Sequence, residues 1–295
     1  MRLLRAATLT TPDVDAAAAR YTQWLDYEVI ERGEVDADLA AGWGAPASAG
    51  RTTAVLRPAS GSEVYLRFVE GDPEPAYRPL RTYGWAAIEI CVQDTLAVAE
   101  RMARSPFEII GPPKALDGLP AIFPMQVKGP DQEIVYLTQI NDDLPAYDLP
   151  RAESLIDKLF ILVLAASDMG ASRDWFARVL DIQAGREMEI VYSMINKAFG
   201  LADEAKHVLT TGIHGRDCFL EFDQYPPEAE TRPGRPDALP PGVAMTTLLH
   251  PSFDTIPGDW IAPPAMREGA IYGGRRTGTL RAPDGTLVEI VACAP

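Results

Sequence analysis

The chain has 295 residues, of which 47% are hydrophobic and 23% are charged, proportions typical of a folded globular protein. Its formal net charge of −15 argues against nucleic acid and anionic membrane surfaces as partners, because both attract basic patches. No apolar stretch reaches the roughly 20 residues of a membrane span, and no signal peptide is evident, so we expect a cytoplasmic protein.

The first 35 residues show a plan that returns later in the chain. TLTTPDVDAAAARYTQWLDYEVIERGEV (8–35) predicts a strand, an amphipathic helix and a second strand. LVLAASDMGASRDWFARVLDIQAGREMEI (162–190) repeats that plan, and Asp13 and Asp168 occupy the same corner. A short acidic side chain there can accept hydrogen bonds from the first helical N–H groups. We therefore expect Asp13 and Asp168 to cap equivalent helices.

The remaining segments repeat in the same way. In chain order, GSEVYLRFVEGDPEP (61–75) is similar to GRDCFLEFDQYPPEA (215–229), and GPDQEIVYLTQI (129–140) is similar to APDGTLVEIVAC (282–293). A second strand–helix–strand begins at GWAAIEICVQDTLAVAERMARSPFEII (84–110), and GVAMTTLLHPSFD (242–254) is its counterpart with a shortened helix. Such periodicity predicts four structural units rather than four unrelated segments.

The predicted closing strand of each unit carries one polar side chain on the face opposite its apolar residues. Side chains alternate across a strand, so Val64, Leu66 and Phe68 share one face. The matching opposite positions of the four units are Arg67, Tyr136, Glu221 and Glu289. A polar residue at one position of every unit indicates a common cavity-facing site.

With this pattern the chain resembles the vicinal oxygen chelate superfamily, which includes glyoxalase I, bleomycin-resistance proteins and extradiol dioxygenases. The resemblance covers nearly the whole chain and implies an α+β fold of four βαβββ modules, paired into two glyoxalase-like domains with cup-shaped sheets. We expect an N-terminal domain over 1–142, without a catalytic role, a linker over 143–156, and a C-terminal domain over 157–295 that holds the site.

Metal ligands in this superfamily come from the first strand and the closing strand of a module. The corresponding first-domain positions include Ala6, Arg67 and Ala87, which do not bind divalent cations. In the second domain Glu221 and Glu289 are retained, but the first-strand positions are Ile161 and Met245. Non-haem iron oxygenases need two imidazoles and a carboxylate, so a standard extradiol dioxygenase is not expected.

The expected site is therefore a cup holding Glu221 and Glu289, either as an acid/base pair or as ligands of a weakly held divalent metal ion (Mg, Mn, Fe or Zn). No cofactor at all is the other alternative. Neighbouring carboxyls repel each other when ionised, which raises the pKa of one and suits proton transfer. Further predicted contacts with the small-molecule ligand are His207, Met245, Ile161, Tyr192 and Phe199, with Arg67 and Tyr136 in the first-domain cup.

Two functions remain open at this stage. The first is a lyase or isomerase acting on a small, partly hydrophobic oxygenated compound, which could be aromatic. The second is a resistance-type protein that binds such a compound without a metal and without turnover. Proteins of this superfamily often pair edges or exchange units, so a homodimer is among the expected assemblies.

Overall fold

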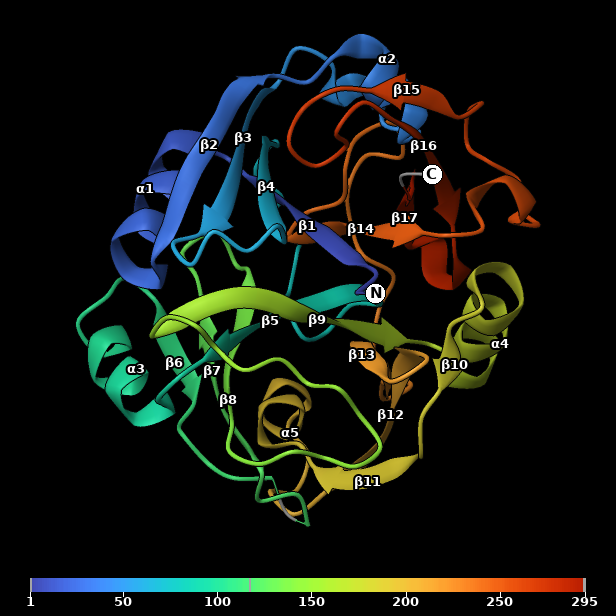
Figure 1. Cartoon of the computed structure of the whole chain (residues 1–295). Helices are drawn as coiled ribbons and strands as arrows, with labels where there is room; N and C mark the ends of the chain where they lie inside the picture. Colours follow the sequence, from blue (N-terminus) through green and yellow to red (C-terminus); the bar gives the residue numbers. More distant parts are fainter. Residues whose placement is uncertain (1, 117, 294–295) are drawn as a thin grey trace.

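The computed structural model describes residues 2–116 and 118–293 and consists mainly of two curved sheets, one above the other in Figure 1. The first unit comprises β1 (Leu4–Thr11), α1 (Val14–Leu25), β2 (Tyr27–Glu34), the insert α2 (Ala37–Gly42), the 3-10 turn η1 (Pro46–Ser48), β3 (Thr52–Pro58) and β4 (Tyr65–Glu70). The second comprises β5 (Gly84–Val92), α3 (Thr95–Met102), β6 (Glu108–Gly111), β7 (Ile122–Lys128) and β8 (Ile134–Ile140).

The later units follow the same plan with changes. The third comprises β9 (Ile156–Ala166), α4 (Met169–Leu180), β10 (Gln183–Ala184), β11 (Met188–Val191), α5 (Ser193–Phe199), β12 (Lys206–His214) and β13 (Asp217–Gln224). The fourth comprises β14 (Val243–His250), η2 (Phe253–Thr255), β15 (Ala265–Arg267), β16 (Arg275–Arg281), η3 (Pro283–Gly285) and β17 (Leu287–Ala292). Its helix is reduced to the 3-10 turn η2, as the sequence predicts.

The helix boundaries confirm the repeat between the first and third units. Asp13 accepts a hydrogen bond from the backbone N–H of Ala16 at the start of α1, and Asp168 does the same with Ala171 at the start of α4, each at 2.9 Å. At the other end, Asp26 and Asp181 adopt left-handed backbone conformations that end these helices. The paired aspartates thus fix equivalent helices in the two halves of the chain.

The sheets do not combine the units as expected. The first sheet has the order β15-β16-β17-β14-β1-β4-β3-β2 and joins units one and four; the second has the order β10-β12-β13-β9-β5-β8-β7-β6 and joins units two and three. Antiparallel pairing of β1 with β14 and of β5 with β9 makes these junctions. Each sheet therefore takes one unit from each half of the chain, so the cups do not correspond to 1–142 and 157–295.

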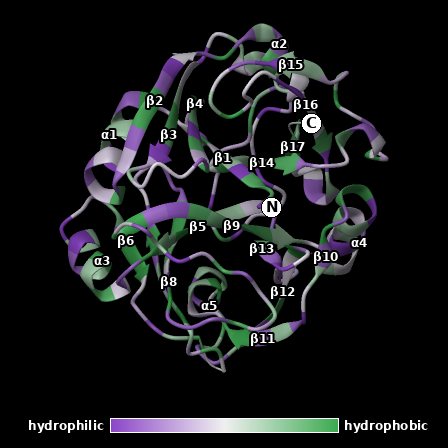
Figure 2. Ribbon diagram, in the orientation of Figure 1, coloured by the Kyte–Doolittle hydropathy of each residue, from purple (hydrophilic) through white to green (hydrophobic). Residues whose placement is uncertain are grey.

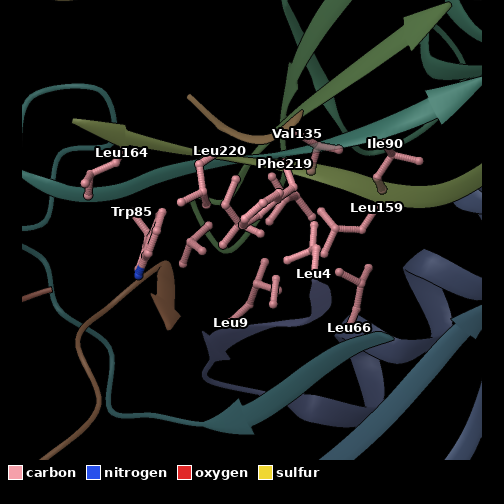
Figure 3. Packing of buried hydrophobic residues seen from close by; sticks show 14 of the residues in the cluster. Leu4, Leu9, Leu66, Trp85, Ile90, Val135, Leu159, Leu164, Phe219 and Leu220 are labelled. Carbon is pink, nitrogen blue, oxygen red and sulfur yellow. The ribbon is translucent and has the colours of Figure 1, made fainter. Parts of the chain in front are cut away.

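The main hydrophobic core lies between the two sheets (Figure 3). Leu4, Leu9 and Leu66 extend from the first sheet toward Leu159 and Leu220 of the second, and all five are buried. The same core takes the apolar faces of the four closing strands, which confirms the predicted alternation. The opposite faces of the sheets are left to form two separate cups.

The helices lie at the margins of this core. In Figure 2, α1 and α3 show hydrophilic as well as hydrophobic residues, which is typical of helices with one buried face. Val14, Ala17, Ala18, Tyr21 and Leu25 form the buried face of α1. None of the described helices is long and apolar enough to cross a membrane.

Trp85 joins the two sheets, and its replacement tests how far the shared core stabilises the molecule. Its indole, on β5, donates a hydrogen bond to the backbone carbonyl of Leu287 on β17, at 2.9 Å in a fully buried position. Trp85→Ala should lower the free energy of unfolding by about 3–5 kcal/mol, measured by urea denaturation. Leu96→Ala, at a position 59% exposed, serves as the control and should change it by less than about 0.5 kcal/mol.

Candidate active site

The sheet pairing decides which of the four predicted polar residues meet. Arg67 on β4 and Glu289 on β17 face the cup of the first sheet, which we call the first cup. Tyr136 on β8 and Glu221 on β13 face the cup of the second sheet, the second cup. Glu221 and Glu289 therefore lie in different cups, and the prediction that they act as one pair is wrong.

The first cup is closed by a buried ion pair. Arg67 Nη2 lies 3.0 Å from Glu289 Oε2, and the two side chains are 4% and 0% exposed. The same carboxylate accepts hydrogen bonds from Thr247 Oγ1 at 2.7 Å, from Trp43 Nε1 at 2.7 Å and from the Tyr272 hydroxyl at 2.9 Å. Both oxygens of Glu289 are thus satisfied by donors of the protein itself.

Aromatic rings complete this closure. The guanidinium of Arg67 lies 4.6 Å from the centre of the Trp43 ring and 5.7 Å from that of Tyr272. Its Nε and Nη2 atoms also donate to Thr8 Oγ1. Met245 is completely buried in the hydrophobic cluster that contains Trp43 and does not line the cavity described below. The first cup has the arrangement of a packed interior.

The second cup contains a cavity of about 270 Å³. Its polar lining includes Glu89, Gln126, Tyr136, Tyr192 and Glu221. Its apolar lining includes Leu116, Leu119, Ile122, Met188, Met194 and Leu209. Concave sites with a largely apolar wall and a few converging polar groups are typical of small-molecule binding.

Two tyrosines connect the cavity to Glu221. The Tyr192 hydroxyl lies 2.8 Å from the Tyr136 hydroxyl and 3.1 Å from Glu221 Oε1. Each hydroxyl has one proton, so if Tyr192 donates to Glu221, Tyr136 donates to Tyr192. When Glu221 is protonated, both hydrogen bonds can reverse direction. The three groups form a short proton relay at the cavity wall.

Three carboxyl groups share this cup. Glu221 and Asp223 are two residues apart on β13 and so face the same side, while Glu89 comes from β5. Burial, followed by repulsion from Glu221, raises the pKa of Glu89 to about 8. Burial also raises the pKa of Glu221, and burial together with Glu221 raises that of Asp223 well above its usual range. Glu89 is therefore mostly protonated at neutral pH.

Asp223 is 1% exposed, and neither of its carboxyl oxygens receives a hydrogen bond from another type of group among the described residues. Glu221 and Asp223 repel each other when both are ionised, so the pair favours states in which at least one of the two carboxyls is protonated.

The donor set does not fit a divalent metal ion. Within 2–116 and 118–293, no group of three or more His, Cys, Asp or Glu side chains is placed to bind one. Glu289 is neutralised by Arg67, and Glu221 lies in the other cup. The Nε2 atom of His207 is hydrogen-bonded to Asn196 Oδ1, at 2.6 Å. The described residues therefore offer no suitable donor set for Mg, Mn, Fe or Zn.

The other predicted contacts lie near the second cup without lining its cavity. Ile161 is buried in the hydrophobic cluster that also contains Tyr136. Phe199 packs edge-on against Tyr225, with ring centres 6.1 Å apart. His207 is buried, and burial lowers its pKa. Of the predicted contacts, Tyr192, Tyr136 and Glu221 line the cavity.

Sequence reasoning missed Glu89 and Asp223. Glu89 lies two residues after Ala87, the position compared with a family ligand, and therefore faces the same side of β5. Asp223 has the same relation to Glu221. The alternation of side chains along a strand places both residues on the cup-facing side, one step beyond the positions compared.

Comparisons with known proteins support the fold. No protein-family model and no curated protein matches the chain. Among solved structures, glyoxalase I from Zea mays is similar with a TM-score of 0.63 and 15% identity, over 98% of this chain and 92% of that one. A "putative dioxygenase" from Bacillus subtilis is similar with a TM-score of 0.61 and 10% identity, over 99% and 85%.

The chain has the vicinal oxygen chelate fold. Both similarities extend over all four units, including the fourth with its shortened helix. At these identities they establish the architecture, whereas the chemistry of the cups has to be argued from the residues of this chain.

The buried pair of the first cup can be tested by removing one or both partners. Arg67→Met leaves the Glu289 carboxylate buried without a cation and should cost about 3–5 kcal/mol of unfolding free energy. Adding Glu289→Leu removes the orphaned charge, so the double variant should be more stable than Arg67→Met. Urea denaturation of both variants measures this coupling.

Arg32→Met serves as the control, because the Arg32–Asp15 pair is exposed and should contribute less than about 1 kcal/mol. A cost for Arg67→Met as small as that of the control would show that the first cup is hydrated and not closed.

Glu89 makes stability depend on pH. A carboxyl whose pKa is higher in the folded than in the unfolded protein stabilises the fold fully at pH values below its unfolded pKa, near 4.5. This contribution is lost as the pH rises through the folded pKa of about 8. The unfolding free energy of the wild type should therefore fall more steeply than that of Glu89→Gln between pH 5 and 8.5, by about 1.4 kcal/mol per unit of pKa difference.

Urea denaturation at pH 5, 7 and 8.5 checks this dependence. The exposed Glu100→Gln on α3 is the matched control and should follow the wild type. Parallel curves for wild type and Glu89→Gln would mean that Glu89 ionises normally in the folded protein.

Proposed function

We propose that the chain is an enzyme of the lyase or isomerase type, acting by proton transfer on a small, partly hydrophobic oxygenated compound in the second cup. The observation that carries this proposal is the cavity of about 270 Å³ beside Glu89 and the Tyr136–Tyr192–Glu221 relay. Carboxyl groups with raised pKa values in a cleft are suited to general acid/base catalysis near neutral pH.

Two carboxyls that line the cavity divide the roles. Glu221, whose ionised form accepts a hydrogen bond from Tyr192, removes a proton from a carbon next to a carbonyl group of the substrate. The electron pair of that C–H bond then moves toward the carbonyl oxygen, which becomes an enolate. Glu89 is protonated at neutral pH and lines the same cavity, so it can donate its proton to this oxygen.

Return of both protons completes the cycle. Glu221 gives its proton to a different carbon, which forms an isomer, or to a departing group, which forms a lyase product. As the carbonyl group forms again, its oxygen returns the other proton to Glu89. Tyr192 and Tyr136 hydrogen-bond to one another and to Glu221, so they hold that carboxyl in place during both transfers. The apolar wall, including Leu116, Ile122 and Leu209, excludes water from the reacting atoms.

A second candidate function is binding without turnover, as in resistance-type proteins. The observation that favours it is the extent of the apolar wall, which suits a hydrophobic compound whatever its reactivity. The names of two structural neighbours, glyoxalase I and "putative dioxygenase", agree better with an enzyme.

Proton exchange at carbon separates the two functions. Phenylacetone and phenylacetaldehyde are incubated with the protein in D₂O, and loss of their α-protons is followed by NMR. We expect catalysed exchange that falls at least about 100-fold in Glu221→Gln, the scale of general-base catalysis. Glu100→Gln, exposed on α3, should leave the exchange rate unchanged.

Binding of both probes in the same samples is read from the methyl signals of Met188 and Met194, which line the cavity. If the probes shift these signals and no exchange is catalysed, the enzyme proposal loses to the binding function.

A further inference from the structure

A row of four neighbouring residues crosses the strands of the second cup, and we call it the floor row. The register pairs Glu89 on β5 with Tyr136 on β8, and Tyr136 with Gln126 on β7. Gln126 is paired in turn with Gly111 on β6. All four residues line the cavity. Because neighbouring strands lie about 4.8 Å apart, the backbones of Glu89 and Gln126 are separated by roughly 10 Å.

The two ends of the floor row differ in their hydrogen bonds. Glu89 accepts a hydrogen bond from the Thr138 hydroxyl, and the Tyr136 hydroxyl is bonded to that of Tyr192. Among the described residues, by contrast, no hydrogen bond joins the half-buried carboxamide of Gln126 to another residue. Polar groups at the wall of a cavity bind either water or a ligand. Gln126 therefore offers one acceptor and one donor group to whatever occupies the cavity.

Gly111 provides the space for this carboxamide. Met125 and Val127 are buried in the main core, so alternation along β7 directs Gln126 to the cup. A side-chain carbon at position 111 would overlap with Oε1 of Gln126. The backbone of Gly111 is not in the left-handed region, so its conformation does not require glycine. The missing side chain at this position thus lets the carboxamide lie at the outer end of the floor row.

We propose that Gln126 determines specificity by binding a hydroxyl group at the end of the substrate distant from its reacting carbonyl. The carbonyl lies at Glu89 and Glu221, and the apolar body between the two ends contacts Leu119 and Ile122. This inference rests on the proposed function, because it assumes that the second cup is the ligand site and that its carboxyls act on the carbonyl end.

The chemistry of a carboxamide explains why a hydroxyl is favoured. A hydroxyl can donate to Oε1 or accept from Nε2, so it fits whichever of these atoms faces the cavity. A methyl group of similar size forms neither bond and displaces the water that would otherwise solvate the amide. The affinity difference between two ligands that differ only in this group therefore measures the contribution of Gln126.

Three related ketones test the inference. 4-Hydroxyphenylacetone, 4-methylphenylacetone and phenylacetone share the carbonyl group and differ at the opposite end of the ring. Their dissociation constants are measured by NMR titration of the Met188 and Met194 methyl signals, with the exposed Met266 on β15 as internal control. We expect the hydroxyl compound to bind at least about fivefold more tightly than the methyl compound, the scale of one neutral hydrogen bond.

Two variants remove the proposed contact in different ways. Gln126→Leu replaces the carboxamide with an apolar group of similar size, whereas Gly111→Ala displaces the carboxamide and leaves it in the chain. In both variants the hydroxyl and methyl compounds should bind with affinities within about twofold of each other. Melting temperatures establish that each variant is folded, and one folded variant is sufficient for the test.

Two further variants identify the group that is responsible. Lys114 lines the same cavity, so Lys114→Met tests whether its ammonium group recognises the hydroxyl instead. Glu221→Gln changes the carbonyl end, so proton exchange should be lost while the preference for the hydroxyl compound remains. We expect the preference to persist in both variants.

The opposing results are distinguishable. If the wild type binds the hydroxyl and methyl compounds equally, or if the preference survives Gln126→Leu and is lost in Lys114→Met, the inference about Gln126 fails and the proposed function remains. If none of the three ketones shifts the signals of Met188 or Met194, the inference and the proposed function fail together.

Discussion

Antiparallel pairing of β1 with β14 and of β5 with β9 is the constraint on which the rest of the structure depends. It joins unit one to unit four and unit two to unit three, so every cup is built from both halves of the chain. The apolar faces of both sheets then pack against one another in a shared core. This pairing of units decides which polar residues share a cup, because it brings Arg67 to Glu289 and Tyr136 to Glu221.

The two cups differ in the charged residues that face them, and their properties differ accordingly. Where the fourth strand of a unit supplies arginine, the carboxylate opposite is neutralised and the cup is packed with aromatic side chains. Where it supplies tyrosine, burial and mutual repulsion raise the pKa values of the carboxyl groups, and these groups lie at a cavity. The same fold therefore provides a stabilising interior in one cup and a candidate active site in the other.

Much of the fold could be predicted from the sequence, because local rules determine it. The alternation around Arg67, Tyr136, Glu221 and Glu289 assigned the faces of the closing strands, and Asp13 and Asp168 marked the helix starts. The pairing of units could not be predicted, since a period of two identifies the face of a strand and not its neighbour. The sequence pattern therefore groups Glu289 with Glu221, whereas in the structure Arg67 lies opposite Glu289. The insert residues Trp43 and Tyr272 fill the first cup. Trp43 contacts Glu289, which lies 246 residues further along the chain, and no local sequence pattern reveals such a contact.

The central claim is that the second cup is the ligand site and the first cup is a packed interior. A crystal structure of the protein soaked with a mixture of small uncharged and cationic aromatic fragments tests this claim most directly. The account predicts fragments in the second cup, in contact with Glu89, Glu221 or Tyr192, and an intact Arg67–Glu289 pair with Trp43 and Tyr272 still packed around it. Fragments in the first cup that displace Tyr272, or a second cup in which an arginine or lysine side chain pairs with Glu221, would contradict it.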